Sequence, residues 1–441
     1  MRNLDTVIIF LRSNNDIDNI APIIYKFGET TSINIKLVFR DSTFIDDFRI
    51  EYVRQYDNVS ISIVDYANGN VISDSRSEDE NTSDIRRRLT TKTKTIGRKF
   101  PTSLPEKLYS LVTTDDFSDS VSTILTKLTA RSENVLLLFD YLPGEKNRLY
   151  HIYAAIIKEA QDRDYTTVAV PHGCGSATNS LVRMDRLEQL VAEGEFKKYD
   201  ASPAELQFHT YERMDIHDYV TIPNNVFKKR FDYFMNENKI KLTGSARYCP
   251  EWISVLQHIT STGKLDINSN EYNIVIFLGR RVGYLSRREV ILTINLVSSL
   301  PNTTVALKNH PRETFIADTN DLYNSESVVF VDNMRSPYIL AWGDIFLSTG
   351  TSVVIDCIMR NKPLLDLDYL HANRWSYVEY MPECEIQTYD ELYHTLVELL
   401  TSDTLSEFYD QSNRNRYIED IVTAGGNDVL QRHIDIFKSI V

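Results

Sequence analysis

Hydroxyl residues and glycine cluster at one point in the second half of the chain. Ser348, Thr349, Gly350, Thr351 and Ser352 directly follow one apolar segment and precede another, VVIDCIMR. Small residues at the start of a helix expose backbone N–H groups, and the helix dipole favours an anion there. The pattern therefore predicts a phosphate site. The alternative is a plain Ser/Thr helix cap, which needs only one such residue.

Two further polar clusters follow apolar segments of the same half. The segment TVALK leads into Asn309, His310, Pro311 and Arg312, and NIVIFL leads into Gly279, Arg280 and Arg281. We expect Lys308 and His310 to contact a phosphate, because a cation neutralises it and an imidazole donates to it. Pro311 fixes the backbone as the chain leaves the strand. Gly279 permits close backbone approach, and Arg280 either grips a phosphate or lies exposed.

In the first half, three residues are candidates for activating an acceptor hydroxyl. Asp140 and Glu145 flank the turn after the apolar run VLLLF, and His172 follows the run TTVAV. A carboxylate or imidazole that protrudes into a cleft is suited to act as a general base. The carboxylates are equally suited to turns and helix caps, and His172 to a backbone hydrogen bond.

Alternating strands and helices must position these residues. In the first half we expect strands at Thr6–Leu11, Ile33–Phe39, Val59–Val64, Val135–Phe139, Thr166–Val170 and Tyr219–Ile222, with helices at Asp16–Phe27 and Arg148–Asp162. In the second half we expect strands at Asn273–Leu278, Thr304–Lys308, Val328–Val331 and Ile345–Leu347, with helices at Arg287–Ser299, Ser352–Met359 and Asp428–Ile440. This order predicts parallel sheets, whose ligands bind beyond the carboxyl ends of the strands.

The chain of 441 residues exceeds the usual size of one core, so we predict two Rossmann-like α/β domains that face an interdomain cleft. The N-terminal acceptor domain covers 1–245, the C-terminal donor domain covers 246–420, and a terminal helix covers 421–441. Residues 71–105 are too polar to bury much apolar area, which predicts a surface loop. Its basic run Arg86–Lys99 is a candidate for peripheral contact with a membrane or an anionic acceptor, and a solvated loop is the alternative.

The composition excludes several classes of protein. The net charge of −14, from 48 Lys and Arg against 62 Asp and Glu, argues against nucleic-acid binding. No run of about 18 apolar residues occurs, and the N-terminus lacks the features of a signal peptide, so we expect a cytoplasmic protein. The four cysteines are far apart and show no metal-ligand spacing, which predicts free thiols and no metal site.

The order of these motifs resembles the GT-B glycosyltransferases that build bacterial surface polysaccharides. The similarity covers roughly residues 135–370 and lies in PHG, in TGSARYCPEW, in the His-Pro pair at 310–311, and in STGTS followed by VVIDCIMRNKPLLDLDY. In that group the His-Pro and Ser/Thr motifs hold a CMP-linked donor such as Kdo or sialic acid, and CDP-glycerol transferases are similar. The resemblance implies that His310 and Pro311 meet the nucleotide, and that Ser348, Thr349, Thr351 and Ser352 cradle its phosphate.

We therefore expect transfer of an acidic sugar from a CMP donor to a hydroxyl of a glycan or lipid-linked glycan, with no cofactor beyond the nucleotide-sugar. No acidic motif of the first half matches the resembled group, so the base or nucleophile stays open among Asp140, Glu145 and His172, and with it the stereochemistry. Asp366 and Asp368 follow KPLL at a late strand end, which indicates a structural or ribose-contacting role rather than a metal site.

Several rivals remain open. One is another GT-B enzyme: a UDP-sugar transferase, a sugar-nucleotide 2-epimerase or a CDP-alditol phosphotransferase. A rival from a different class is a nucleotide-sugar-binding protein without catalytic activity. That protein would keep the STGTS and His-Pro sites, and loss of Asp140, Glu145 and His172 would leave its function unchanged.

Overall fold

A computed structural model describes most of the chain. The described residues are 4–73, 117–129, 132–140, 142, 147–170, 177–192, 212–228, 231, 234–261, 267, 270–279, 285–310, 313–316, 320, 322–323, 325–402 and 405–441. Glu145, His172, Arg280, Pro311 and the Arg86–Lys99 run lie outside them, so the predictions on these residues stay predictions.

The chain forms two compact units. The first contains Met1–Gly173, Tyr211–Arg247 and Asp428–Val441, and the second contains Cys174–Thr210 and Tyr248–Asn427. Of the described residues, 177–192 belong to the second unit although they precede residue 245, and the C-terminal helix belongs to the first.

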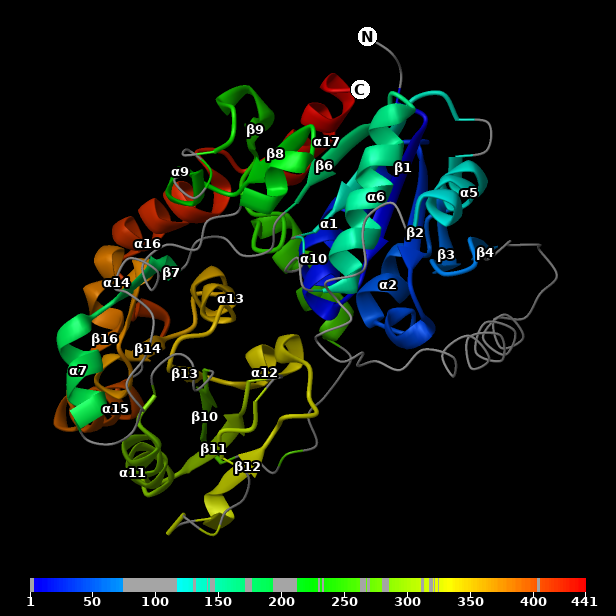
Figure 1. The fold of residues 1–441 in the computed structure, drawn as a ribbon. Coiled ribbons are helices and arrows are strands. Elements are labelled where there is room, and N and C mark those ends of the chain that lie inside the picture. The colour runs from blue at the N-terminus through cyan, green and yellow to red at the C-terminus, as the bar shows by residue number, and fades with distance from the viewer. Residues whose placement is uncertain are drawn as a thin grey trace. The chain divides into compact units, whose positions relative to one another are not determined.

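The first unit is built on one sheet with strands in the order β4-β3-β2-β1-β5-β6-β8-β9 (Figure 1). The strands are β1 (Thr6–Leu11), β2 (Asn34–Phe39), β3 (Val59–Asp65), β4 (Asn70–Ser73), β5 (Val135–Phe139), β6 (Thr166–Ala169), β8 (Tyr219–Ile222) and β9 (Ile240–Leu242). All neighbours pair in parallel except β4, which is antiparallel to β3. Every residue of β1 and β5 is buried, as expected of parallel strands covered on both faces.

The helices of this unit are α1 (Asn14–Thr30), α2 (Phe48–Val53), α5 (Ser118–Thr129), α6 (Arg148–Asp162), α9 (Asn225–Lys228) and α17 (Val429–Ser439). Ser13 caps α1 by accepting the Asp16 N–H. The terminal helix α17 packs on α1, where the rings of Phe27 and Phe437 stack at 6.2 Å. This contact buries the apolar face of α17 and explains why the end of the chain returns to the first unit.

The second unit has a fully parallel sheet in the order β12-β11-β10-β13-β14-β16. Its strands are β10 (Tyr272–Phe277), β11 (Thr303–Lys308), β12 (Val328–Phe330), β13 (Ile345–Ser348), β14 (Leu364–Leu367) and β16 (Glu385–Ile386). Its helices are α7 (Met184–Ala192), α10 (Pro250–Thr260), α11 (Arg287–Ser298), α12 (Ser336–Trp342), α13 (Val354–Met359), α14 (Ser376–Tyr380), α15 (Tyr389–Thr401) and α16 (Gln411–Tyr417). A separate antiparallel pair joins β7 (Ala177–Val182) to β15 (Asn373–Trp375).

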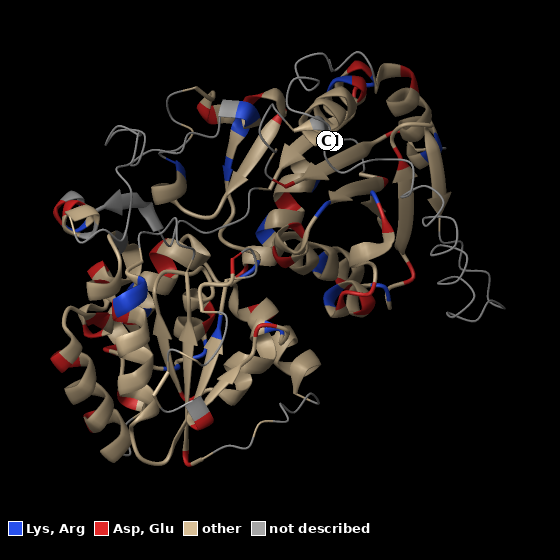
Figure 2. Cartoon of the chain, turned by 60° about the horizontal axis from the view of Figure 1, so that its bottom comes forward, with Lys and Arg blue, Asp and Glu red and all other residues tan. Residues whose placement is uncertain are grey.

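Each unit is thus a Rossmann-like α/β unit, which confirms the predicted fold class. In Figure 2 charged residues gather on helices and at strand ends, and the strand interiors are largely uncharged. Val71–Ser73, which we expected in the surface loop 71–105, belong to β4 instead. Residues 74–105 lie outside the described residues, so the loop stays a prediction there. Within the described part of the chain, no helix combines the length and apolar character that a membrane span requires.

Candidate functional site

The structure brings three of the predicted clusters to one edge of the second sheet. Gly279 lies just past β10, His310 just past β11, and Ser348 ends β13. These three strands are adjacent and parallel, in the order β11-β10-β13. Their carboxyl ends therefore meet at the same edge, which is where open parallel sheets bind ligands.

The ends of β10 and β13 are joined by the first residues of the hydroxyl-rich turn. The Gly279 N–H donates to Thr349 Oγ1 at 2.7 Å, and the Thr349 N–H donates to the carbonyl of Phe277 at 3.2 Å. A Cβ atom on residue 279 would lie 2.8 Å from the Thr349 carbonyl oxygen, so only glycine fits there. Thr349 is buried, and its hydroxyl fixes the turn instead of facing a ligand.

Gly350 has a backbone conformation that glycine favours. Its φ is +95°, and the Ser348 hydroxyl accepts the Gly350 N–H at 3.0 Å. A Cβ atom here would lie 2.3 Å from Cζ2 of Trp375, so the indole packs directly on the glycine. Ser348 is buried like Thr349. The expected cradle of Ser and Thr hydroxyls thus differs in the structure, because two of its members brace the turn.

The last two residues of the turn are placed differently. Thr351 Oγ1 is buried and has no hydrogen-bond partner among the described residues. Ser352 is exposed, and its carbonyl accepts the Tyr248 hydroxyl at 2.9 Å. Helix α13 begins only at Val354, and its N-cap residue Val353 makes no side-chain cap. The alternative of a plain Ser/Thr cap is therefore not what the structure shows.

Lys308 does not match its predicted role. Its ammonium is buried and donates to the carbonyls of Val331, Asp332 and Met334 at 3.3, 3.2 and 2.6 Å. Burial lowers the pKa of this ammonium. With three backbone carbonyls as partners, Lys308 holds the loop after β12 and has no proton left for a phosphate. His310 is half-buried beside it, and its carbonyl accepts the Glu313 N–H at 3.0 Å.

In the first unit, Asp140 lies at the carboxyl end of β5 and belongs to a buried ionic cluster. Arg12 Nη2 lies 3.1 Å from Asp140 Oδ2, and Arg12 Nε lies 3.0 Å from Asp16 Oδ2. Burial raises the pKa of Asp16, and the neighbouring Asp140 raises it further. Burial alone would lower the pKa of Arg12, but the two carboxylates raise it above its ordinary value.

Sequence reasoning missed Arg12 and Asp16. The available signal was their position, because Arg12 follows β1 as Asp140 follows β5, and these strands are neighbours. Ser13 and Asp16 also have the spacing of a capping box. Both carboxylate side chains are fully buried, so Asp140 acts on Arg12 and is poorly placed to reach an acceptor. Glu145 and His172 stay predicted bases.

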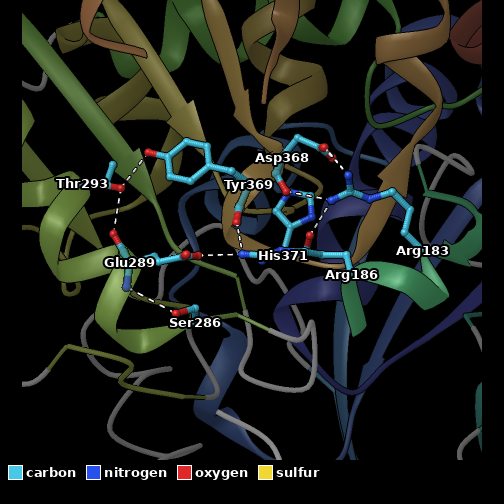
Figure 3. A network of polar contacts seen from close by, with 8 residues as sticks. All are labelled: Arg183, Arg186, Ser286, Glu289, Thr293, Asp368, Tyr369 and His371. Atoms are coloured by element: carbon cyan, nitrogen blue, oxygen red, sulfur yellow. Dashed lines mark hydrogen bonds and ion pairs between the residues drawn. The ribbon is translucent and has the colours of Figure 1, made fainter. Parts of the chain in front are cut away.

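A second polar network surrounds Asp368 (Figure 3). Asp366, Asp368 and His371 are buried, and one ligand atom of each lies within 4.8 Å of the others, a grouping that suits a metal ion. Asp368 is, however, paired with Arg183, and Asp366 accepts the Tyr377 hydroxyl at 2.8 Å. Burial raises the pKa of Asp368 to about 6, against the opposing effect of Arg183. These partners favour the structural role expected from the sequence.

A polar cavity of about 370 Å³ adjoins this network. Its lining includes Arg183, Arg186 and Glu289, and Arg186 Nη2 lies 2.7 Å from Glu289 Oε2. The same guanidinium donates to the carbonyl of Tyr369. Both arginines of this cavity are therefore paired with carboxylates of its lining, Arg183 with Asp368 and Arg186 with Glu289.

No protein-family model matches the chain, and no curated protein matches it in sequence. Solved structures match over almost the full length. UDP-GlcNAc 2-epimerase from Neisseria meningitidis bound to UDP-GlcNAc has a TM-score of 0.57 at 11% identity, covering 99% of this chain and 100% of that one. The S. aureus MnaA–UDP co-structure has a TM-score of 0.54 at 12% identity, covering 99% and 98%. The glycotransferase of kitacinnamycin has 0.54 at 12% identity, covering 99% and 100%. At such identities the likeness shows the fold alone, which is GT-B.

Proposed function

We propose that the chain is a nucleotide-sugar-dependent glycosyltransferase that binds its donor at the carboxyl edge of the second unit's sheet. The observation that carries the proposal is the meeting of Gly279, His310 and the Gly350–Ser352 turn at three adjacent strand ends. Within this turn Thr351 keeps a buried hydroxyl without a partner among the described residues. Such a hydroxyl is suited to bond a phosphate oxygen.

The proposed site would work by stabilising the departing nucleotide. As the sugar–phosphate bond breaks, negative charge grows on the phosphate, and preoriented N–H and O–H donors stabilise it. Gly350, Thr351 and Ser352, which follow β13, would supply those donors. His310, which follows β11, would supply another. The acceptor hydroxyl, on a glycan or lipid-linked glycan, would lose its proton to a base for which Glu145 and His172 are the proposed residues.

Two kinds of nucleotide-sugar donor are each supported by a different observation. A CMP-linked acidic sugar is supported by the order of the His-Pro and STGTS motifs. A UDP-sugar is supported by two fold neighbours, one named as a UDP co-structure and one as an epimerase bound to UDP-GlcNAc. Because of these neighbours, a UDP-sugar 2-epimerase is the second candidate function. An epimerase would act on the nucleotide-sugar without an acceptor.

The test is to incubate the protein with a CMP-linked acidic sugar or with UDP-GlcNAc, each with and without hydroxylated glycan acceptors, and to follow products by NMR. Acceptor-dependent release of CMP or of UDP supports the transferase and identifies the donor. Conversion of UDP-GlcNAc without an acceptor, at the sugar C2, would replace the transferase by the epimerase. Unchanged substrates in every mixture would contradict both.

A further inference from the structure

Trp375 lies against the hydroxyl-rich turn although it is distant in sequence. An ideal Cβ atom on Gly350 would lie 2.3 Å from Cζ2 and 3.0 Å from Nε1 of this indole. The ring also stacks on Tyr377, with centroids 6.3 Å apart. The indole therefore forms one wall of the turn, and its nitrogen is on the side next to Gly350.

Two polar groups at this point have no hydrogen-bond partner among the described residues. They are the buried Nε1 of Trp375 and the buried Oγ1 of Thr351. A buried polar group left without a partner is destabilising, so each such group in a folded protein requires an explanation. The indole N–H can only donate, and the hydroxyl can donate as well. Two donors beside one turn match the oxygens of a phosphate.

A segment from the first half of the chain holds Trp375 in place. Strand β15, which ends at Trp375, pairs with β7, and the chain then continues from β7 into Arg183. The Arg183 N–H donates to the carbonyl of Ala372 at 2.7 Å. Ala372 directly precedes β15, three residues before Trp375. This pairing is the reason that residues 177–192 belong to the second unit.

The Arg183 side chain fixes the turn that leads into β15 (Figure 3). Its guanidinium pairs with the Asp368 carboxylate and donates to the carbonyls of Asp368 and His371 at 2.8 and 2.6 Å. One planar group therefore holds three acceptors of the segment 368–371.

We propose that Trp375 is a ligand-contacting residue of the nucleotide site, where its indole N–H and the Thr351 hydroxyl bind one phosphate of the nucleotide, and that Arg183 is the positioning residue for this indole. The proposal rests on the proposed function, because it supplies a phosphate to the same turn. It goes further in assigning two residues that no motif indicated, one of them from the first half of the chain.

The first test is Trp375→Phe, which removes the N–H and keeps an aromatic ring against Gly350. Nucleotide affinity, measured by calorimetry with the nucleotide that stabilises the wild type, should fall about tenfold, as expected for one lost hydrogen bond to a charged group. The variant should keep the thermal midpoint of the free wild type within a few degrees. Unchanged affinity in a folded variant would overturn the ligand contact and leave the proposed function standing.

The second test follows the position of the indole without any nucleotide. Arg183→Ala should red-shift the tryptophan emission and increase its quenching by acrylamide, and both changes should vanish in the Trp375→Phe background. Arg414→Ala is the matched control, because Arg414 also donates to backbone carbonyls of this unit, those of Ile358 and Met359. It should leave emission and quenching unchanged.

Equal emission in the wild type and Arg183→Ala would overturn the positioning role. If no nucleotide binds the wild type, the proposed function and the phosphate contact fail together, and the fluorescence comparison alone then decides whether Arg183 positions Trp375.

Discussion

The backbone N–H of Gly279 donates to the side-chain oxygen of Thr349 across 2.7 Å, and this bond joins the ends of two neighbouring strands. It lies at the centre of the proposed site, with β11 and His310 on one side and the Gly350 turn on the other. The same contact leaves no room for a side chain on residue 279. This pair therefore fixes the turn together with the Ser348 hydroxyl, which accepts the Gly350 N–H.

Thr349→Val should destabilise the protein by about 1–3 kcal/mol, because it keeps the shape of the side chain but leaves the buried Gly279 N–H without its acceptor. Thr349→Ser retains the hydroxyl and should restore most of the loss. Urea unfolding of the three proteins measures both effects. Equal stability of the Val variant and the wild type would mean that the bond does not hold the turn.

Gly350→Ala should both destabilise the protein and weaken nucleotide binding. A side chain at φ +95° is strained, at a cost of about 1–2 kcal/mol, and here it also collides with Trp375. Gly425→Ala is the matched control, since Gly425 has φ +80° and nothing within 4 Å of an added Cβ atom. The control should show the strain alone.

Thermal unfolding of both glycine variants, with and without nucleotide, separates strain from collision. We expect the midpoint of Gly350→Ala to fall further than that of Gly425→Ala, and only Gly350→Ala to lose its response to nucleotide. Identical behaviour of the two variants would contradict the close packing of Trp375 on the turn.

Arg12→Ala should destabilise the protein by about 3 kcal/mol or more at pH 7, because it leaves Asp16 and Asp140 buried without their cation. Burial and the neighbouring Asp140 already raise the pKa of Asp16, so the loss should shrink as the pH falls and Asp16 takes up a proton. The double variant Arg12→Ala/Asp140→Ala should lose less free energy of unfolding than the two single variants lose together. Additive losses in a double-mutant cycle would separate the two residues energetically.

His217→Phe should make the protein more resistant to acid. His217 is fully buried next to Phe139, neither ring nitrogen has a hydrogen-bond partner among the described residues, and burial lowers its pKa to about 3. Below about pH 6.5 His217 takes up a proton in the unfolded chain but stays neutral in the folded protein. The free energy of unfolding of the wild type therefore falls between pH 6.5 and pH 3.

At pH 4 this loss amounts to about 3 kcal/mol relative to a chain without that histidine. Urea unfolding at pH 7 and pH 4 should therefore show a smaller fall in the free energy of unfolding for His217→Phe than for the wild type. Parallel falls in the two proteins would rule out His217 as a source of acid sensitivity.

The strands were predictable because a parallel strand buried on both faces leaves an uninterrupted apolar run. Thr6–Leu11, Val135–Phe139 and Tyr219–Ile222 have the bounds expected from the sequence, and the order of elements predicted two Rossmann-like units. The position of Gly279, His310 and Ser348 at strand ends followed from the same runs. Which strands become neighbours, and hence that these ends meet, is decided by the packing of the whole sheet.

The partners of individual polar side chains were not predictable from the sequence. Lys308 has the position of a phosphate ligand, yet its protons go to three carbonyls more than 20 residues later. Asp140 resembles an exposed base in sequence, yet it pairs with Arg12 from the start of the chain. Trp375 carried no motif at all. Each of these partners is distant in sequence, and local rules describe only near neighbours.

The most direct test of the proposed nucleotide site is thermal unfolding with CMP, CDP, UMP, UDP, GDP and ADP, in the wild type, in His310→Ala and in His394→Ala, an exposed histidine of α15. A ligand of the native state raises Tm with its concentration. We predict that a cytidine or uridine nucleotide raises the Tm of the wild type and of His394→Ala by several degrees, and that His310→Ala responds less. CMP would support the acidic-sugar donor, and UDP the UDP-sugar. No response to any of the six nucleotides, or an undiminished response in His310→Ala, would contradict a nucleotide site at the ends of β10, β11 and β13.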